Sequence, residues 1–206
     1  MYKELSAPVE HEHLVQLFDD LSSLSDGVAR FLHDGFTKGN ALLVVATAEH
    51  WDAIATRLGA RGCTVPEWVQ HERLVVLDAH ETLASFMKAG RPDAILFDET
   101  VGALVRTLSA GGRPLRIYGE MVDVLATEAM YTGARELEDL WNRLAERESF
   151  MLFCGYDSSN FGNPVTGAAL RSICQLHSRV QCAPGDVLGS FLLHTYAGGA
   201  IHAPGT

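Results

Sequence analysis

Five stretches of this chain are apolar almost throughout, without a regular alternation of apolar and polar residues. They are His13–Phe18, Ala41–Thr47, Arg73–Ala79, Leu115–Glu120 and Phe150–Tyr156. Short runs of continuous hydrophobicity are typical of strands that are covered on both faces, as in a parallel sheet. The pattern therefore predicts a mainly parallel sheet of about five or more strands.

Between these runs the apolar residues recur with the spacing of an α-helix. Residues 24–39, 51–58, 101–108 and 137–144 each place their apolar side chains on one face, and a further helix is expected over Leu170–Val180. Gly39, Gly62 and Gly90 are expected to end helices, because glycine adopts the left-handed conformation that follows a helix. Strands that alternate with helices predict an α/β fold with a doubly wound sheet.

The turn between the first strand and the first helix carries two carboxylates. Its sequence is Asp19-Asp20-Leu21-Ser22-Ser23, and Ser23 or Ser25 is the expected helix cap. A nucleotide-binding α/β protein would carry a glycine-rich loop with Lys and Ser or Thr at this turn. Two anions repel phosphate, so the turn argues against ATP hydrolysis and favours sensing or binding.

Length and charge narrow the function classes further. A chain of 206 residues is long enough for a full core, and we expect a domain over residues 1–183 and a tail over 184–206 that is flexible or docks on a partner. The formal net charge is −10 and no basic stripe is visible, which argues against direct nucleic-acid binding. No apolar run is long enough for a membrane span and no secretory signal precedes the domain, so the cytoplasm is expected.

The candidate ligand-binding residues follow from the fold. In open α/β sheets ligands lie at the carboxyl ends of the strands, where Asp19, Glu120 and Tyr156 are expected. Glu120 directly follows an apolar strand and Gly119, which is typical of an acid in a cleft; alternatively it caps the next helix. The complete set of candidates is His13, Asp19, Glu120, Cys154, Tyr156 and His177. The sequence leaves the cofactor unknown.

Two cysteines and a histidine allow a second interpretation. Cys174 and His177 are three residues apart on the expected last helix, which should cover Cys154, and His13 could add a fourth ligand for zinc. The alternative is that both cysteines are small core residues. No Gly-x-Ser-x-Gly or His-Glu-x-x-His pattern is present, so the sequence does not indicate an enzyme.

Several stretches in a fixed order resemble the MEDS domain family, named for methanogen/methylotroph proteins and the DcmR sensory domain. The matching stretches are His13–Asp20, Phe31–Gly39, Leu43–His50, Gly90–Asp93, Arg116–Asp123, Leu137–Asn142 and Ile173–His177. Two positions depart from the family pattern: Phe18 stands where the family often has Tyr, and Gly39-Asn40 where it often has Gly-Glu. If those polar groups bind ligand, this chain binds something different or less polar.

The resemblance implies a RecA/KaiC-like fold that has lost its Walker A loop. It also implies a sensory domain that binds a small molecule, with hydrocarbon derivatives as the suggested class. Such a domain acts in signal transduction or transcriptional regulation through a regulatory protein partner or as a homodimer. The alternatives are a residual nucleotide-binding protein without a P-loop, a metal-dependent enzyme that uses Cys154, Cys174 and His177, and a scaffold.

Overall fold

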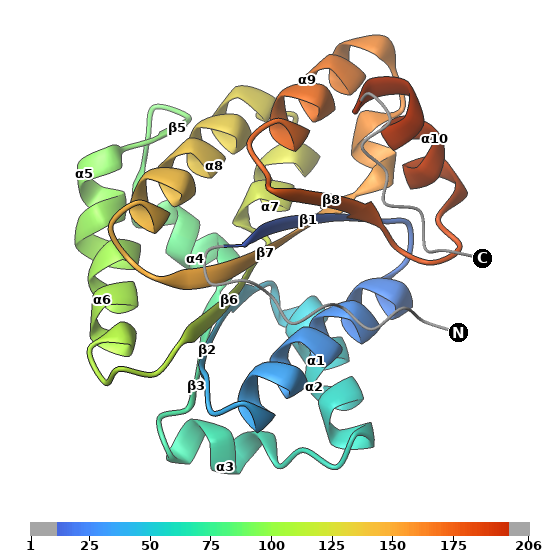
Figure 1. Cartoon of the computed structure of the whole chain (residues 1–206). Coiled ribbons are helices and arrows are strands. Elements are labelled where there is room, and N and C mark those ends of the chain that lie inside the picture. Colours follow the sequence, from blue (N-terminus) through green and yellow to red (C-terminus); the bar gives the residue numbers. More distant parts are fainter. Residues whose placement is uncertain (1–11, 198–206) are drawn as a thin grey trace.

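The centre of the molecule is a six-stranded sheet in which all neighbouring strands are parallel. The computed structural model describes residues 12–197 (Figure 1). The strand order is β3-β2-β6-β7-β1-β8, so the chain starts near one edge, crosses to the other and returns. The strands are β1 His13–Phe18, β2 Ala41–Ala46, β3 Leu74–Asp78, β6 Leu115–Gly119, β7 Phe150–Asp157 and β8 Arg179–Cys182. This order confirms the doubly wound α/β prediction and agrees with a RecA-like arrangement.

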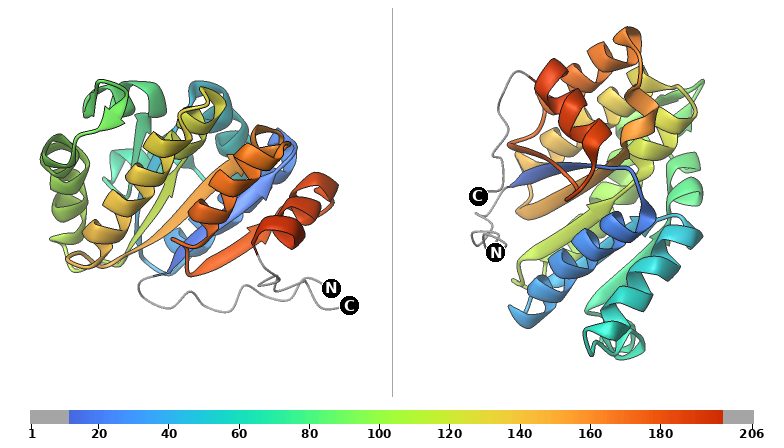
Figure 2. Two further views of the ribbon diagram at one scale, coloured as in Figure 1. Left: turned by 90° about the horizontal axis from the view of Figure 1, so that it is seen from above. Right: turned by 90° about the vertical axis from the view of Figure 1, so that its right-hand side faces the viewer.

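Helices cover both faces of the sheet (Figure 2). On one face, which we call the α1 face, lie α1 Leu21–Thr37, α2 Ala48–Ala60 and α3 Val65–Gln70. The opposite face, the α8 face, carries α4 Ala79–Ala84, α5 Ala94–Phe97, the π-helical turn η1 Asp98–Gly102, α6 Ala103–Ser109, α7 Met121–Thr127, α8 Tyr131–Ala145, α9 Pro164–Cys174 and α10 Val187–Tyr196. The helices change face where the chain reverses direction across the sheet, as right-handed crossovers require. A hairpin of β4 Met87–Lys88 and β5 Arg91–Pro92 and a 3-10 turn η2 Ser158–Phe161 complete the fold.

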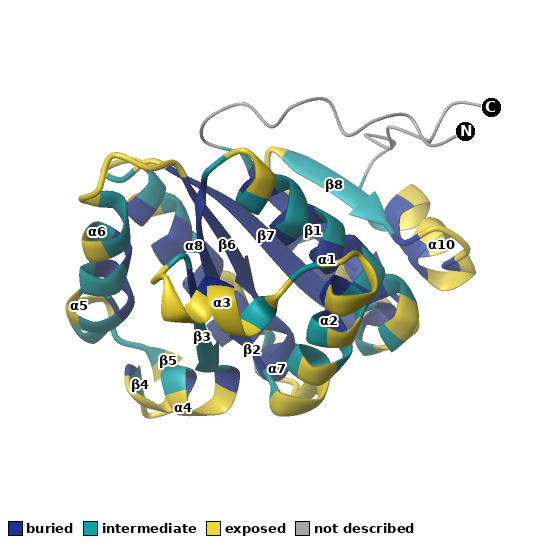
Figure 3. Ribbon diagram, turned by 90° about the horizontal axis from the view of Figure 1, so that it is seen from below, coloured by how far each residue is buried: buried dark blue, intermediate teal, exposed yellow. Residues whose placement is uncertain are grey.

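Two hydrophobic cores follow from this layering. Side chains at alternate strand positions point to opposite faces, so Val15 and Leu17 pack under α8 and α9, whereas Leu14 and Phe18 pack under α1. The central strands β1, β2, β6 and β7 are buried along nearly their whole length, and β8 at the edge is only half-buried (Figure 3). A polar side chain on a central strand must therefore find its partners inside the protein.

Three local predictions were wrong. The first helix begins at Leu21, and its cap is Asp20, whose carboxylate accepts a hydrogen bond from the N–H of Ser23 at 2.8 Å. Gly39 and Gly62 follow α1 and α2 with positive φ, as expected, but Gly90 lies in the turn between β4 and β5. The helix expected over Leu170–Val180 ends at Cys174, and the chain continues into β8.

The C-terminal segment is helical in its first part. Helix α10 buries Leu192 and Leu193 in the core of the α8 face and leaves Val187, Leu188 and Phe191 exposed. Residues 198–206 lie outside the described residues, and a domain boundary at residue 183 stays a prediction. Among residues 12–197, no helix is both long and apolar enough to cross a membrane.

Substitution of two glycines tests the packing of α10 against α9. A Cβ on Gly167 in α9 would lie 2.3 Å from Cζ of Tyr196, so Gly167→Ala must displace the tyrosine ring and is expected to lower the free energy of unfolding by about 1–3 kcal/mol. Gly59 in α2 has nothing within 4 Å of its Cβ position. Gly59→Ala is therefore the matched control and is expected to stabilise the protein by about 0.5–1 kcal/mol. Urea unfolding measures both; equal effects would contradict the packing of Tyr196 on Gly167.

Candidate functional site

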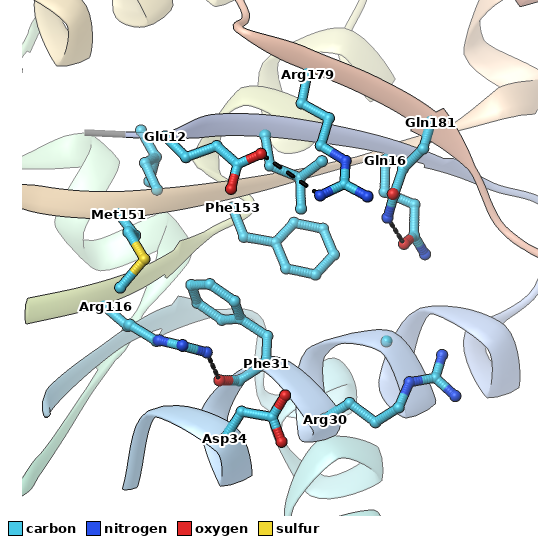
Figure 4. A pocket seen from close by; sticks show the side chains of 13 residues that line it. Glu12, Gln16, Arg30, Phe31, Asp34, Arg116, Met151, Phe153, Arg179 and Gln181 are labelled. Carbon is cyan, nitrogen blue, oxygen red and sulfur yellow. Dashed lines mark hydrogen bonds and ion pairs between the residues drawn. The ribbon is translucent and has the colours of Figure 1, made fainter. Parts of the chain in front are cut away.

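A cavity lies between α1 and the sheet, on the α1 face (Figure 4). Its volume is about 60 Å³. Apolar walls come from Leu14, Phe31, Met151 and Phe153, which belong to β1, α1 and β7. The cavity also receives polar side chains from three strands and from α1, so it joins an apolar floor to a polar surface. This combination is typical of a site for a small organic molecule.

Arg116 is the buried cation of this cavity. Its strand, β6, is apolar around it, and its side chain is only 2% exposed. One guanidinium nitrogen, Nη1, donates to the carbonyl oxygen of Phe31 at 2.7 Å, and the guanidinium carbon lies 5.0 Å from the centre of the Phe31 ring. Nε has no hydrogen-bond partner, and burial lowers the pKa of the guanidinium. Arg116 therefore lines the cavity with an unused donor.

Gln16 supplies a second unused donor. Its side chain projects from β1 and is 4% exposed. The amide oxygen accepts a hydrogen bond from Nε2 of Gln181 at 2.8 Å, whereas its own Nε2 has no partner. Unpartnered buried donors are rare in proteins because each one loses its hydration without compensation. An acceptor atom of a bound molecule would satisfy either donor.

Charged residues surround the cavity with both signs. Arg179 of β8 lies 3.5 Å from the carboxylate of Glu12, and Asp34 and Arg30 approach from α1 (Figure 4). Three arginines and two carboxylates leave a local formal charge of +1, in a chain whose formal net charge is −10. The formal charge around the cavity is therefore positive, whereas that of the whole chain is negative.

Two glycines of α1 make room for the polar side chains. A Cβ on Gly35 would lie 2.7 Å from Cδ of Arg116, and a Cβ on Gly27 would lie 3.2 Å from Nε2 of Gln16. Glycine inside a helix costs about 0.5–1 kcal/mol relative to alanine. Sequence analysis did not select any residue of this cavity. The available signals were an arginine inside an apolar strand and two glycines inside an amphipathic helix.

On the α8 face, four of the six predicted site residues lie together. His13, Cys154, Tyr156 and His177 surround the carboxylate of Glu138, which projects from α8 and is fully buried. Nε2 of His13 lies 3.2 Å from Oε2 of Glu138 and 3.4 Å from Sγ of Cys154. Tyr156 donates its hydroxyl to Oε1 of Glu138 at 2.9 Å, and Nε2 of His177 lies 3.4 Å from the same oxygen.

Glu138 is the member of this cluster that the sequence analysis missed. Burial alone raises the pKa of Glu138, but His177 and His13 outweigh burial and hold the pKa well below its ordinary value. Burial and the neighbouring carboxylate raise the pKa values of the Cys154 thiol and the Tyr156 phenol well above their ordinary range. The carboxylate is thus the charged group of the cluster, and the thiol and the phenol are its neutral donors.

Cys174 does not belong to this cluster. The group of side chains close enough to share one ion is His13, Glu138, Cys154 and His177. Because α9 ends at Cys174, His177 lies beyond the helix and does not share a helical face with it. Burial raises the pKa of the Cys174 thiol to about 12. The set considered for zinc therefore loses Cys174, keeps His13 and gains Glu138.

Glu120 and Asp19 lie at the carboxyl ends of their strands, apart from this cluster. Glu120 is 2% exposed and binds His50 at 2.8 Å, the hydroxyl of Tyr118 at 3.0 Å and the backbone N–H of Thr47. Its carboxylate makes no capping hydrogen bond to α7, so it joins the ends of β2 and β6. Asp19 is exposed in the turn after β1, where Asp186 and Asp20 add negative charge.

Asp123, three residues after Glu120, is expected to make the stability of the protein depend on pH. Burial raises its pKa from 3.8 to about 7, although its carboxylate accepts a hydrogen bond from the N–H of Asp157 at 2.9 Å. The folded protein thus keeps a proton that the unfolded chain releases above pH 4, and stability falls as pH rises toward 7. Asp123→Asn keeps the acceptor and removes the titration. Its stability relative to the native chain should rise by up to about 1.4 kcal/mol per pH unit until about pH 7.

Urea unfolding of both proteins between pH 5 and 8 measures this difference. The hydrogen bond to Glu120 raises the pKa of His50 and outweighs burial, which lowers it. The free energy of unfolding therefore also falls through His50 as pH rises above 6.5. His50 is present in both proteins, and its contribution largely cancels in the comparison. A difference that stays constant over this range would contradict a buried, protonated Asp123.

Comparison with known families places the chain in one of them. The family model described as "MEDS: MEthanogen/methylotroph, DcmR Sensory domain" matches residues 12–178. This range includes the residues of the cavity up to Met151–Phe153 and the whole Glu138 cluster. No curated protein matches the chain. MEDS is a sensory family rather than a catalytic one, and because its model matches most of the sequence, this chain belongs to the MEDS family.

Proposed function

We propose that this chain is a sensory domain that binds a small organic molecule with an acidic or acceptor end in the cavity of the α1 face. The observation that carries the proposal is Arg116, a buried guanidinium with one carbonyl partner on Phe31 and an unused Nε. Such a group is costly to bury without a carboxylate partner. A ligand carboxylate or a similar acceptor would satisfy it and would gain a charge-assisted hydrogen bond.

The volume of the cavity limits the size of the ligand. The cavity of about 60 Å³ is well below the roughly 300–1,000 Å³ of sites for drug-sized ligands, so it suits a small molecule. The polar end of the ligand would lie at Arg116 and Gln16, and its short hydrocarbon part would contact Phe31 and Phe153. A longer ligand would extend toward solvent beside Arg179 or would require α1 to move away from the sheet. Hydrocarbon derivatives of low mass are therefore the class that we propose.

Helix α1 is the element that would carry the signal. It contributes Gly27, Phe31 and Asp34 to the cavity and also packs against α2, so its position reports whether the cavity is filled. A ligand shifts this position only by its different affinity for the two arrangements. We propose that a regulatory protein partner or a second copy of this chain reads the change, in the cytoplasm. The proposal includes neither catalysis nor direct binding to nucleic acid or a membrane.

Short carboxylates test the proposal directly. Formate, acetate and propionate should raise the thermal unfolding midpoint of the full chain, and acetamide, propionamide and ethanol serve as neutral probes. At one hundred times Kd a ligand adds about 2.7 kcal/mol, which is several degrees for a protein of this size. Calorimetric titration then gives the affinity. If none of the carboxylates binds, the proposal of an acidic ligand is wrong. If the amides bind more strongly than the carboxylates, the ligand carries a neutral acceptor instead.

Arg116→Met should abolish this effect while the protein stays folded. Methionine fills a similar space without a charge, and an apolar side chain of similar volume in place of a buried charged one is expected to leave the protein folded. Arg73→Met is the matched control, because Arg73 also lies over a ring, 4.1 Å from Phe36, and donates to carbonyl oxygens, but outside the cavity. Equal loss of binding in both variants would mean that Arg116 has no specific role.

A further inference from the structure

We propose that His13, Glu138, Cys154 and His177 form a zinc site on the α8 face. This inference is independent of the ligand cavity, which lies on the other face of the sheet. Two imidazole nitrogens, a carboxylate oxygen and a sulfur lie within 4.8 Å of one another. Imidazole, thiolate and carboxylate are the ligands that Zn²⁺ uses in proteins, and four protein ligands make a closed, tetrahedral site.

Several of the distances between the ligand atoms are those expected in a tetrahedron around zinc, and none exceeds 4.8 Å. Bonds of about 2.0–2.3 Å to nitrogen, oxygen and sulfur place neighbouring ligand atoms about 3.3–3.7 Å apart. Nε2 of His13 lies 3.2 Å from the carboxylate of Glu138 and 3.4 Å from Sγ of Cys154. Sγ of Cys154 is 3.6 Å from the same carboxylate, and Nε2 of His177 is 3.4 Å from its other oxygen. Small movements of these side chains would complete the coordination.

The outer hydrogen bonds of both histidines prepare Nε2 as a ligand. Nδ1 of His177 lies 2.8 Å from the carbonyl oxygen of Ile173, which can only accept, so Nδ1 carries the proton. Nδ1 of His13 lies 2.8 Å from Oδ1 of Asn142, and Asn142 is oriented by donating Nδ2 to the carbonyl oxygen of Leu176 at 2.9 Å. In the neutral form, which is the form that binds a metal, each ring directs its Nε2 lone pair toward Glu138. Such second partners are a regular feature of zinc-binding histidines.

The rest of the cluster supports a cation at its centre. Nε2 of His177 makes no hydrogen bond although the side chain is fully buried, so the electron pair of the neutral ring lacks a partner there. Tyr156 donates to Oε1 of Glu138 and leaves Oε2 for a metal. When zinc binds, the thiol of Cys154 releases its proton to solvent and forms the Zn–S bond as a thiolate. The charges of Zn²⁺, the thiolate and the carboxylate then sum to zero in a site without water.

A zinc ion here would join separate parts of the chain. His13 belongs to β1, Cys154 to β7 and Glu138 to α8, and His177 precedes β8. A closed four-ligand site has no open position for a substrate, which favours a structural or regulatory role over hydrolysis. Loss of the ion would weaken the attachment of α8 to the sheet, so zinc availability would control how tightly this face is held.

Metal analysis of the full chain tests the inference. Protein purified without chelator should contain about one zinc ion per chain, and Cys154→Ala should lose it. Cys174→Ala is the matched control, because it also removes a buried thiol but lies outside the cluster, and it should keep the zinc. Asn142→Leu, which keeps all four ligands, should weaken zinc binding about 10- to 100-fold because His13 loses its orienting partner.

Cobalt substitution keeps the test decisive if a variant fails to fold. The native chain, stripped with chelator and titrated with Co²⁺ alone, should show the strong visible bands of tetrahedral cobalt and a thiolate-to-metal charge-transfer band. Zn²⁺ should then displace the cobalt and remove both. Native protein that binds neither ion, or that gives only the weak bands of six-coordinate cobalt, would overturn the site. Carboxylate binding at Arg116 is measured separately, so the two proposals fail independently.

Discussion

Burial of the parallel sheet on both faces is the constraint on which the rest of this structure depends. The central strands are buried along nearly their whole length, so a polar side chain that they carry needs a partner within the protein or a bound group. The buried polar side chains concerned are Arg116 and Gln16 on the α1 face and His13, Cys154 and Tyr156 on the α8 face. In both places polar groups remain incompletely matched, at Nε of Arg116, Nε2 of Gln16 and Nε2 of His177. Asn40, Arg73 and Ser109 also bury atoms without a partner, but those residues line neither the cavity nor the Glu138 cluster. In both proposals a bound group would complete the missing interactions.

The same two strands serve both sites. In β7, Phe153 points to the cavity and the next residue, Cys154, points to the Glu138 cluster; in β1, Gln16 and His13 divide in the same way. Successive side chains of a strand point to opposite faces of the sheet, so one strand contributes residues to both sites. The two sites are therefore separated by the thickness of one sheet, and a shift of β1 or β7 would alter both. A filled cavity and an occupied cluster would each favour one position of these strands, which is the physical basis of coupling between sites.

Sequence reasoning succeeded where a single physical signal was sufficient. Continuous apolar runs located five strands, and their alternation with amphipathic helices predicted the fold. Strand β8 was missed because it is short, lies at the edge and contains Arg179 and Gln181, so it lacks the hydrophobicity of a buried strand. Glu138 was missed because it lies beside the apolar stripe of α8, where a charged residue usually faces solvent. The cavity could not be predicted, since it depends on what the side chains of α1 leave unfilled above Arg116.

The complete burial of Glu138 also limits how fast its cluster can exchange an ion with solvent. The cluster approaches the surface at His13, whose side chain is 10% exposed beside a pocket that Asn142 and Ser178 also line, whereas Glu138 behind it is fully buried. An ion or an oxidant therefore reaches Glu138 only after a local opening around it, and such openings are slow compared with side-chain motion. The cavity at Arg116 is bordered by partly exposed charges such as Arg179, so a small solute can enter and leave without such an opening. One face of the sheet would thus respond to rapid changes in solute concentration, while the other would preserve a state for as long as the core stays closed.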